Sequence, residues 1–503
     1  MLRFLAQLEA KILCALLVCA AAQGLAVAQS SNPASAPVQD PTASQASSQT
    51  ASSTQQPAST PPGTPVPSAD SSDDSNDADT LTLFPHSETA RYWISGQANI
   101  VMQWHGAFPA EYSGPNSLRA VGENATSKVY TLYLGYELTH TTEVFLDMES
   151  SGGHGLSNSL GLAGITNLDV VRNGSLSQVP YVARFMIRQI IPLSDDRVEE
   201  DRDELHLATS VPARRIEFRV GKFSLADFLD LNTWGQDSHL QFLNWTVDNN
   251  GAWDYAANTR GYTDGVLLEY DDHWWTARFV EALMPKVANG VHLDADVGRA
   301  RAENLEFEAR GSLIAHRAGV VRLLSYLNTA DMGNYKEAVA DYLDDETATP
   351  DIIATRRQGR HRYGFGLNFE QAVTSNFGVF GRLGWSDGRN ESFAYTEDDR
   401  TLELGGFFSG AQWHRKNDRA GAVFVANGIV AAHQQYLADG GLGFLLGDGA
   451  LTYGPEKVFE GFYTLHLWRG FFASFDIQHV NNPGYNQARG PITVPGLRFH
   501  VDF

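Results

Sequence analysis

Apolar and polar residues alternate in short segments along most of the chain. In residues 214–222, RRIEFRVGK, the apolar residues Ile216, Phe218 and Val220 are separated by charged ones, and residues 361–371, HRYGFGLNFEQ, repeat the pattern. Successive side chains of an extended strand point to opposite faces, so each such segment has one apolar face and one polar face. The pattern therefore predicts strands, and it shows no sustained period of 3.6 residues that would predict long helices.

The last segment, residues 495–503, shows the same pattern with an aromatic residue at its end. Leu497, Phe499, Val501 and Phe503 share one face of the predicted strand. Elsewhere the polar faces carry charged residues and glycines, whereas the inside of a soluble barrel is apolar. A regularly apolar face beside a polar face is typical of barrels that present the apolar face to lipid. A soluble periplasmic β-protein is the alternative interpretation.

The spacing of the predicted strands also favours a transmembrane antiparallel β-barrel. Bacterial barrels have short turns at one end and long loops at the other. The pattern marks 17 candidate strands, whereas a single-chain barrel of this kind has an even number. We therefore expect about 16, possibly 18, strands, with a missing or false strand between about 92 and 211, which we place around 151–180. The short links are 271–273, 372–376, 414–419 and 468–470, and the long ones include 223–261, 328–361 and 433–457.

The first 80 residues differ from the rest. Residues 1–28 combine Arg3 and Lys11 with a short apolar run and the sequence AVA, which predicts a signal peptide. Residues 29–80 are rich in Ser, Thr, Ala and Pro and end in an acidic stretch, which predicts a disordered tether. The barrel is then expected over residues 81–503. Both cysteines of the chain lie in the predicted signal peptide, which excludes disulfides and thiolate metal sites from the mature protein.

Composition and charge narrow the function classes. Hydrophobic residues make up 43% of the chain, too few for a helical membrane protein of this length. The formal net charge of −22 argues against a nucleic-acid partner. The sequence has no nucleotide or redox-cofactor motif, so we expect no cofactor and no metal, and any transport should run downhill.

Several stretches resemble one family, the carbohydrate-selective porins of the OprB type. They include YSGPNSLRAV at 112–121, the glycine-rich stretch 131–167, the aromatic-rich stretch 220–265 and the closing strands up to Phe503. The resemblance spans roughly 92–503. It implies an outer-membrane barrel of about 16 strands that passes small carbohydrates by facilitated diffusion, with loops folded into the pore. The tether at 29–80 is additional to that family pattern.

The residue types on the polar faces suit sugar recognition. Arginine can donate paired hydrogen bonds to neighbouring hydroxyls, and aromatic rings can cover the apolar faces of a sugar. Charged residues on a lipid-facing surface would cost about 2–4 kcal/mol each near the bilayer midplane, so we place them in the lumen. Alternatively, these groups only pair with each other and do not contact substrate. The candidate pore-lining residues are Arg184, Arg188, Arg215, Glu217, Arg219, Trp234, Trp253, Asp254, Arg278 and Arg382.

Three functions remain open from the sequence. We favour a passive sugar-preferring porin in the outer membrane of a Gram-negative-type bacterium. A general or anion-preferring porin would also use lumen arginines, and a barrel enzyme or an adhesin is the third possibility. No catalytic set stands out, so we expect no enzyme activity. The expected partners are small carbohydrates, outer-membrane lipid and the barrel-assembly machinery, which would bind the strand ending at Phe503, and a monomer is preferred to a trimer.

Overall fold

The computed structural model describes residues 81–170, 176–312, 314 and 317–503. The segments predicted to be a signal peptide and a tether, 1–28 and 29–80, lie outside the described residues. Within the described part of the chain, no helix is both long and apolar enough to cross a membrane.

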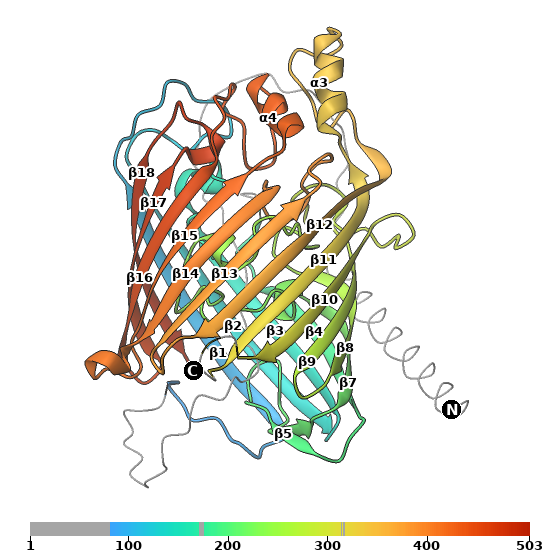
Figure 1. Ribbon diagram of the computed structural model, residues 1–503, viewed down its shortest axis with the longest axis vertical. Helices are drawn as coiled ribbons and strands as arrows, with labels where there is room; N and C mark the ends of the chain where they lie inside the picture. Colours follow the sequence, from blue (N-terminus) through green and yellow to red (C-terminus); the bar gives the residue numbers. More distant parts are fainter. Residues whose placement is uncertain (1–80, 171–175, 313, 315–316) are drawn as a thin grey trace. The chain divides into compact units, whose positions relative to one another are not determined.

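The described chain forms a closed antiparallel β-barrel (Figure 1). The barrel has 16 strands. Neighbouring barrel strands are consecutive in the chain, and β18 closes the barrel against β1. The predicted fold class is therefore confirmed with 16 strands, and the alternative of 18 is wrong. The barrel strands are β1 (Tyr92–His105), β2 (Glu123–Thr139), β3 (Thr142–Gly153), β4 (Tyr181–Pro192), β7 (Arg215–Phe223), β8 (Thr263–Asp271), β9 (Trp275–Leu283), β10 (Arg301–Gly311), β11 (Gly319–Met332), β12 (Arg357–Ala372), β13 (Phe377–Ser386), β14 (Arg400–Ser409), β15 (Arg419–Gly428), β16 (Glu456–Trp468), β17 (Phe471–Asn481) and β18 (Ile492–Asp502).

The odd count of 17 candidate strands came from the region between residues 92 and 211. The described residues 154–170 and 176–180 contain no strand, so these described parts of the region are loop with one 3-10 turn. The short strands β5 (Arg197–Glu199) and β6 (Ser210–Pro212) pair only with each other and form a separate two-stranded sheet. Four barrel strands therefore begin between 92 and 211, which restores an even number.

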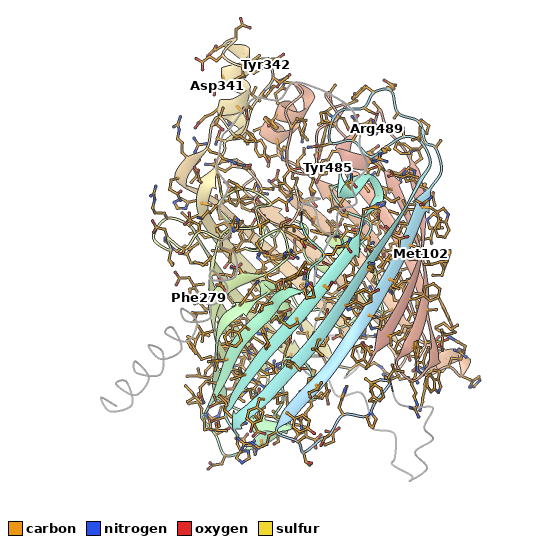
Figure 2. All side chains as sticks on the ribbon, turned by 180° about the vertical axis from the view of Figure 1, so that it is seen from behind. Met102, Phe279, Asp341, Tyr342, Tyr485 and Arg489 are labelled. Atoms are coloured by element: carbon orange, nitrogen blue, oxygen red, sulfur yellow. The ribbon has the colours of Figure 1, made fainter. Side chains whose placement is uncertain are left out.

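The two faces of the barrel wall differ as the alternation predicts. Large apolar side chains point outward, such as Leu305, which is 54% exposed, and Phe365, which is 58% exposed. Phe279 and Met102 lie on the barrel wall in Figure 2. The inward positions between them are buried and mostly polar. An outer surface of this kind is suited to hydrocarbon, where each backbone polar group must be paired within the barrel.

The connections are long at one end of the barrel and mostly short at the other. We call these ends the long-loop end and the short-turn end. The helices α3 and α4 lie at the long-loop end, at the top of Figure 1. The connection 193–214, which holds β5 and β6, is a long one at the short-turn end. The helices are α2 (Trp245–Asp248), α3 (Tyr335–Leu343) and α4 (Ala431–Ala438), with 3-10 turns at η1 (Leu156–Ser159), η2 (Leu225–Asp227), η3 (Gly410–Trp413) and η4 (Pro483–Tyr485).

Candidate functional site

Buried ion pairs run along the inner wall of the barrel. The Arg188 guanidinium on β4 lies 3.1 Å from Glu143, 2.8 Å from Glu200 and 2.6 Å from Glu217. Arg188 is fully buried, so all three contacts are shielded from solvent. Glu143 and Glu217 come from the strands on either side of β4, whereas Glu200 comes from the 193–214 connection. One arginine therefore joins three segments of the chain.

Neighbouring arginines on β7 share one of these carboxylates. Arg215 Nε lies 2.6 Å from Glu217 and Arg219 Nη2 lies 3.0 Å from the same carboxylate. Arg219 also donates to the Leu205 carbonyl at 3.2 Å. Since β7 alternates with period two, Arg215, Glu217 and Arg219 all face inward and their charges alternate. The local sequence RRIEFR is therefore sufficient to build this pairing.

The network continues across β9 to β12. Arg278 on β9 donates to Glu306 and Glu308 on β10, each at 3.0 Å, and also pairs with Glu269 on β8. Arg322 on β11 lies 2.9 Å from Glu308 and 3.0 Å from Glu370. Arginine charges in this wall are thus matched by carboxylates on the adjacent strands.

Two more arginines tie an inward-folded loop, residues 224–262, to the wall. Arg184 on β4 lies 2.6 Å from Asp227 of this loop and 3.0 Å from Asp147 on β3. Arg382 on β13 lies 2.9 Å from Asp230 of the loop and 3.1 Å from Glu403 on β14. The loop is therefore held by ion pairs from different parts of the wall, and almost all of its residues are buried.

The aromatic residues of this loop form a packed core inside the barrel. Trp253 is 1% exposed and its Nε1 donates to Asn304 Oδ1 on β10 at 2.9 Å. The Trp253 ring contacts Tyr255, and Tyr255 contacts Tyr395 with ring centroids 4.6 Å apart. Trp234 packs instead over Gly378 on β13, where the missing side chain leaves room for the indole. The loop's aromatic side chains therefore pack against the inner wall of the barrel and against the connection 387–399.

Asp254 connects the inward-folded loop to the connection 387–399. Its carboxylate accepts backbone N–H groups of Phe393 at 3.0 Å, Ala394 at 2.8 Å and Tyr395 at 3.3 Å. A buried carboxylate that accepts several N–H groups satisfies donors that a loop would otherwise leave unpaired. The position of Asp254 therefore indicates a role in holding two long loops together.

These contacts place every candidate pore-lining residue. Arg184, Arg188, Arg215, Glu217, Arg219, Arg278 and Arg382 are buried on the lumen side of the wall. Trp234, Trp253 and Asp254 belong to the inward-folded loop. Their contact with a sugar stays a prediction.

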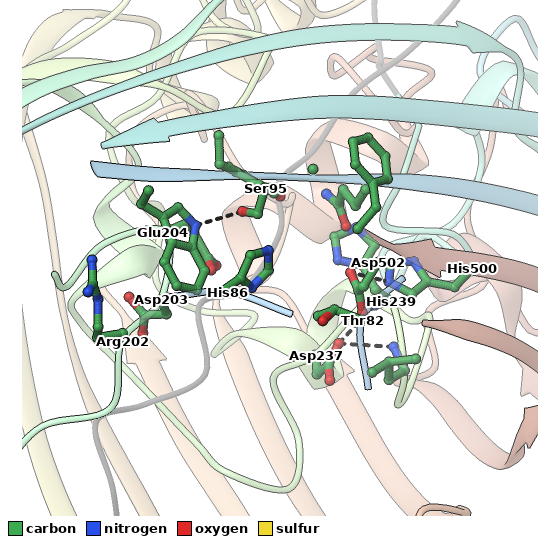
Figure 3. A pocket seen from close by; sticks show the side chains of 16 residues that line it. Thr82, His86, Ser95, Arg202, Asp203, Glu204, Asp237, His239, His500 and Asp502 are labelled. Carbon is green, nitrogen blue, oxygen red and sulfur yellow. Dashed lines mark hydrogen bonds and ion pairs between the residues drawn. The ribbon is translucent and has the colours of Figure 1, made fainter. Parts of the chain in front are cut away.

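A cavity of about 300 Å³ lies where β1 and β18 meet, beside the inward-folded loop (Figure 3). Acidic residues from three separate segments line it, namely Asp203 and Glu204 of the 193–214 connection, Asp237 of the inward-folded loop and Asp502 of β18. His239 and His500 also line it, and their rings stack with centroids 5.2 Å apart. Carboxylates and imidazole nitrogens at a polar cavity can accept hydrogen bonds from hydroxyl groups.

Sequence reasoning missed most of the residues that line this cavity. The 193–214 connection has no strand period, so alternation gave no direction for Asp203 or Glu204. Their side chains lie within the barrel end, where burial raises the pKa of Asp203 to about 7 and that of Glu204 to about 8. Burial also lowers the pKa of His206, which faces Asp203 at 2.9 Å, to about 4. The signals in the sequence were His500 and Asp502, which alternate with the apolar residues of the last strand and so share its polar face.

Comparison with known proteins identifies the family. A family model described as "Carbohydrate-selective porin, OprB family" matches residues 116–503. The high-pH structure of Pseudomonas putida OprB is similar in fold, with a TM-score of 0.61 at 14% identity, and the match covers 82% of this chain and 94% of that one. The outer membrane channel DcaP of Acinetobacter baumannii matches with a TM-score of 0.46 at 8% identity, over 84% of this chain and 100% of that one. No curated protein matches the sequence.

Proposed function

Because the chain belongs to the OprB family of carbohydrate-selective porins, we propose that it forms a passive, sugar-preferring channel for small carbohydrates. The family and the fold point to a channel rather than an enzyme. In this proposal the barrel lies in the outer membrane of a Gram-negative-type bacterium, with the long-loop end outside and the short-turn end at the periplasm.

The observation that supports a sugar-preferring channel is that the lumen arginines are paired with carboxylates. Arg188 and Arg278 each contact three carboxylates, so neither presents an uncompensated positive charge. An anion-preferring porin needs net positive charge along its path, because an unpaired charge is what concentrates an anion. A wall of paired charges instead offers many fixed donors and acceptors with little net charge. Such a surface suits neutral polyhydroxylated solutes and favours the sugar channel over the anion-preferring porin.

The remaining partners follow from the same proposal. The exposed apolar belt contacts outer-membrane lipid. The β18 strand, which ends beside Phe503, is the segment that the assembly machinery would bind. The barrel is closed by its own β1 and β18, so each chain can form a complete pore, and we propose a monomer.

The test is single-channel conductance of the mature protein in a planar bilayer, with mono- and disaccharides added in steps. We expect the current to fall saturably with particular sugars and the reversal potential in a salt gradient to show little anion preference. Arg278→Gln should weaken the sugar effect, whereas Ser325→Ala, on an outward position of β11, should leave it unchanged. An ionic current that no sugar affects, with strong anion preference, would favour the general or anion-preferring porin.

A further inference from the structure

A basic groove lies at the short-turn end of the barrel. It has a volume of about 580 Å³ and is lined by His414, Arg415 and Lys416 of the β14–β15 connection and by His466 and Trp468 at the end of β16. His414, Arg415 and Lys416 are all exposed. Asp418 also lines the groove and pairs with Arg415. On a chain whose net charge is −22, this turn still adds His414 and Lys416 beside that ion pair.

Hydrogen bonds join the two turns that form this basic groove. Arg415 Nη2 donates to the His466 carbonyl at 2.9 Å, and Asn417 Nδ2 lies 3.3 Å from His466 Nδ1. His466 Nε2 lies 2.5 Å from the carbonyl oxygen of Arg469, whose guanidinium stacks over Trp468 at 4.9 Å. Arg469 therefore extends the basic groove into the β16–β17 turn.

The chain enters the described structure beside this same turn. Leu83 N–H donates to the Asp502 carbonyl at 2.8 Å, and Asp502 N–H donates to the Gly470 carbonyl at 2.9 Å. Arg469 Nη1 lies 3.4 Å from the Leu83 carbonyl. Leu83 therefore lies at the edge of the basic groove, beside Arg469.

The sequence just before that point is strongly acidic. Residues 70–79 contain five aspartates and no basic residue. The chain from Asp79 to Leu83 spans at most about 14 Å when fully extended. The C-terminal end of the acidic segment can therefore reach the groove. Covalent connection through a short linker gives it an effective concentration in the millimolar range.

We propose that the acidic segment 70–79 binds the basic groove formed by His414, Arg415, Lys416 and Arg469. The segment then lies along the rim of the barrel rather than across its opening, next to the cavity that Thr82 and His86 line. Charge complementarity and chain connection favour this occupant. The phosphates of an anionic lipid are the competing occupant, because Leu467 and Trp468 beside the groove are 54% and 51% exposed.

The experiment uses the absence of cysteine from the chain after residue 19. A spin label is attached to Ser75→Cys in the otherwise complete mature protein, and its mobility is measured in neutral detergent at low and high salt. We expect an immobilised signal at low salt that is lost in 1 M NaCl, where charges are screened beyond about 3 Å. Lys416→Glu combined with Arg469→Asn should reduce the immobilised fraction about fivefold or more, because surface ion pairs are individually weak and act together here. Asparagine is chosen at 469 because that residue has a φ of 45°, which asparagine tolerates.

Two controls separate the groove from other causes. A label at Ser53→Cys should be mobile under every condition, and Lys336→Glu on α3 at the long-loop end should leave the signal from position 75 unchanged. All variants should keep the heat-modifiable migration of a closed barrel. The proposal is overturned if the label at 75 is as mobile as the label at 53, or if it is immobilised but insensitive to the groove variant. Immobilisation that appears only after phosphatidylglycerol is added would assign the groove to lipid phosphate instead.

Discussion

At the residue scale, Arg188 is one of two lumen-wall arginines that each contact three carboxylates. We expect Arg188→Met to lower the free energy of unfolding by about 3–5 kcal/mol, because it removes a buried cation that three carboxylates share. Glu217 keeps its pairs with Arg215 and Arg219, so the cost falls mainly on Glu143 and Glu200. Urea unfolding of the protein in lipid vesicles measures this change. Arg299→Met is the matched control, since Arg299 is 63% exposed and its pair with Asp296 is long at 4.0 Å. A loss of less than about 1 kcal/mol is expected there, and an equal loss in both variants would contradict a structural role for the buried pairing.

A second residue-scale prediction concerns pH. Burial raises the pKa of Asp203 to about 7 and of Glu204 to about 8, so both carboxyls gain negative charge between pH 6 and 9. We expect the ratio of cation to anion permeability to rise over this range, on the order of twofold. The folded protein binds these protons more tightly than the unfolded chain, so their charging also lowers stability as pH rises from about 4 to 8.

The control for this pH effect is Asp203→Asn combined with Glu204→Gln. This variant should flatten the rise in the permeability ratio measured from reversal potentials. His206 stays neutral throughout because burial lowers its pKa to about 4. If the double variant keeps the full rise, other groups in the cavity carry it and the prediction is wrong.

The sequence predicted that the lumen arginines point inward, but it did not predict all of their ion-pair partners. The inward direction of Arg215 and Arg219 follows from period two alone, which any strand imposes. Their partner Glu217 is visible in the same strand. Glu200 was not predictable as a partner of Arg188, because it lies on an irregular connection whose path depends on the closed barrel.

At the element scale, the inward-folded loop is held by contacts far apart in the sequence. We expect Asp254→Ala to separate this loop from the connection 387–399, because three backbone N–H groups lose their acceptor. The cost should be about 1–3 kcal/mol for the unpaired buried donors. Limited trypsin digestion should then cleave faster at the exposed Arg389, and single-channel conductance should increase. Asp344→Ala, at the exposed end of α3, should change neither measurement, and slow cleavage in both variants would argue against the anchoring role of Asp254.

The strands themselves were largely predictable, and the exceptions have physical reasons. Short links such as 372–376 and 468–470 were recognised because polar turns interrupt clear alternation. The strand count was uncertain at 151–180 because glycines and other small residues there show no alternation of large apolar and polar side chains. The 193–214 connection lies at the short-turn end although it is long, so loop length alone could not assign it to that end.

At the scale of the whole molecule, the barrel exists only if its first and last strands meet. Backbone hydrogen bonds between Gly96 and Phe503, at 2.7 and 2.9 Å, close this seam. The sequence predicted the apolar face of the last strand, but the partner of Phe503 on β1 is remote in the chain and depends on all the strands between them. The closed barrel was therefore predicted from the number and type of strands, because no local pattern in the sequence identifies the two strands that meet.

The packing at this seam gives a prediction for assembly. The ring of Phe503 covers Gly96, where an added Cβ would lie only 2.6 Å from the ring and 2.7 Å from the Thr131 carbonyl. Both Gly96→Val and Phe503→Ser should therefore reduce the fraction of closed barrel, Gly96→Val by steric conflict and Phe503→Ser by loss of the covering ring. The fraction that migrates as a compact, heat-modifiable band on a gel measures closure. Ala98→Val, two residues along the same outward face of β1, keeps the seam intact and should close normally because its partner there is Val501. Normal closure of Gly96→Val would show that the seam tolerates a side chain, and the contact between Gly96 and Phe503 would then have no part in barrel formation.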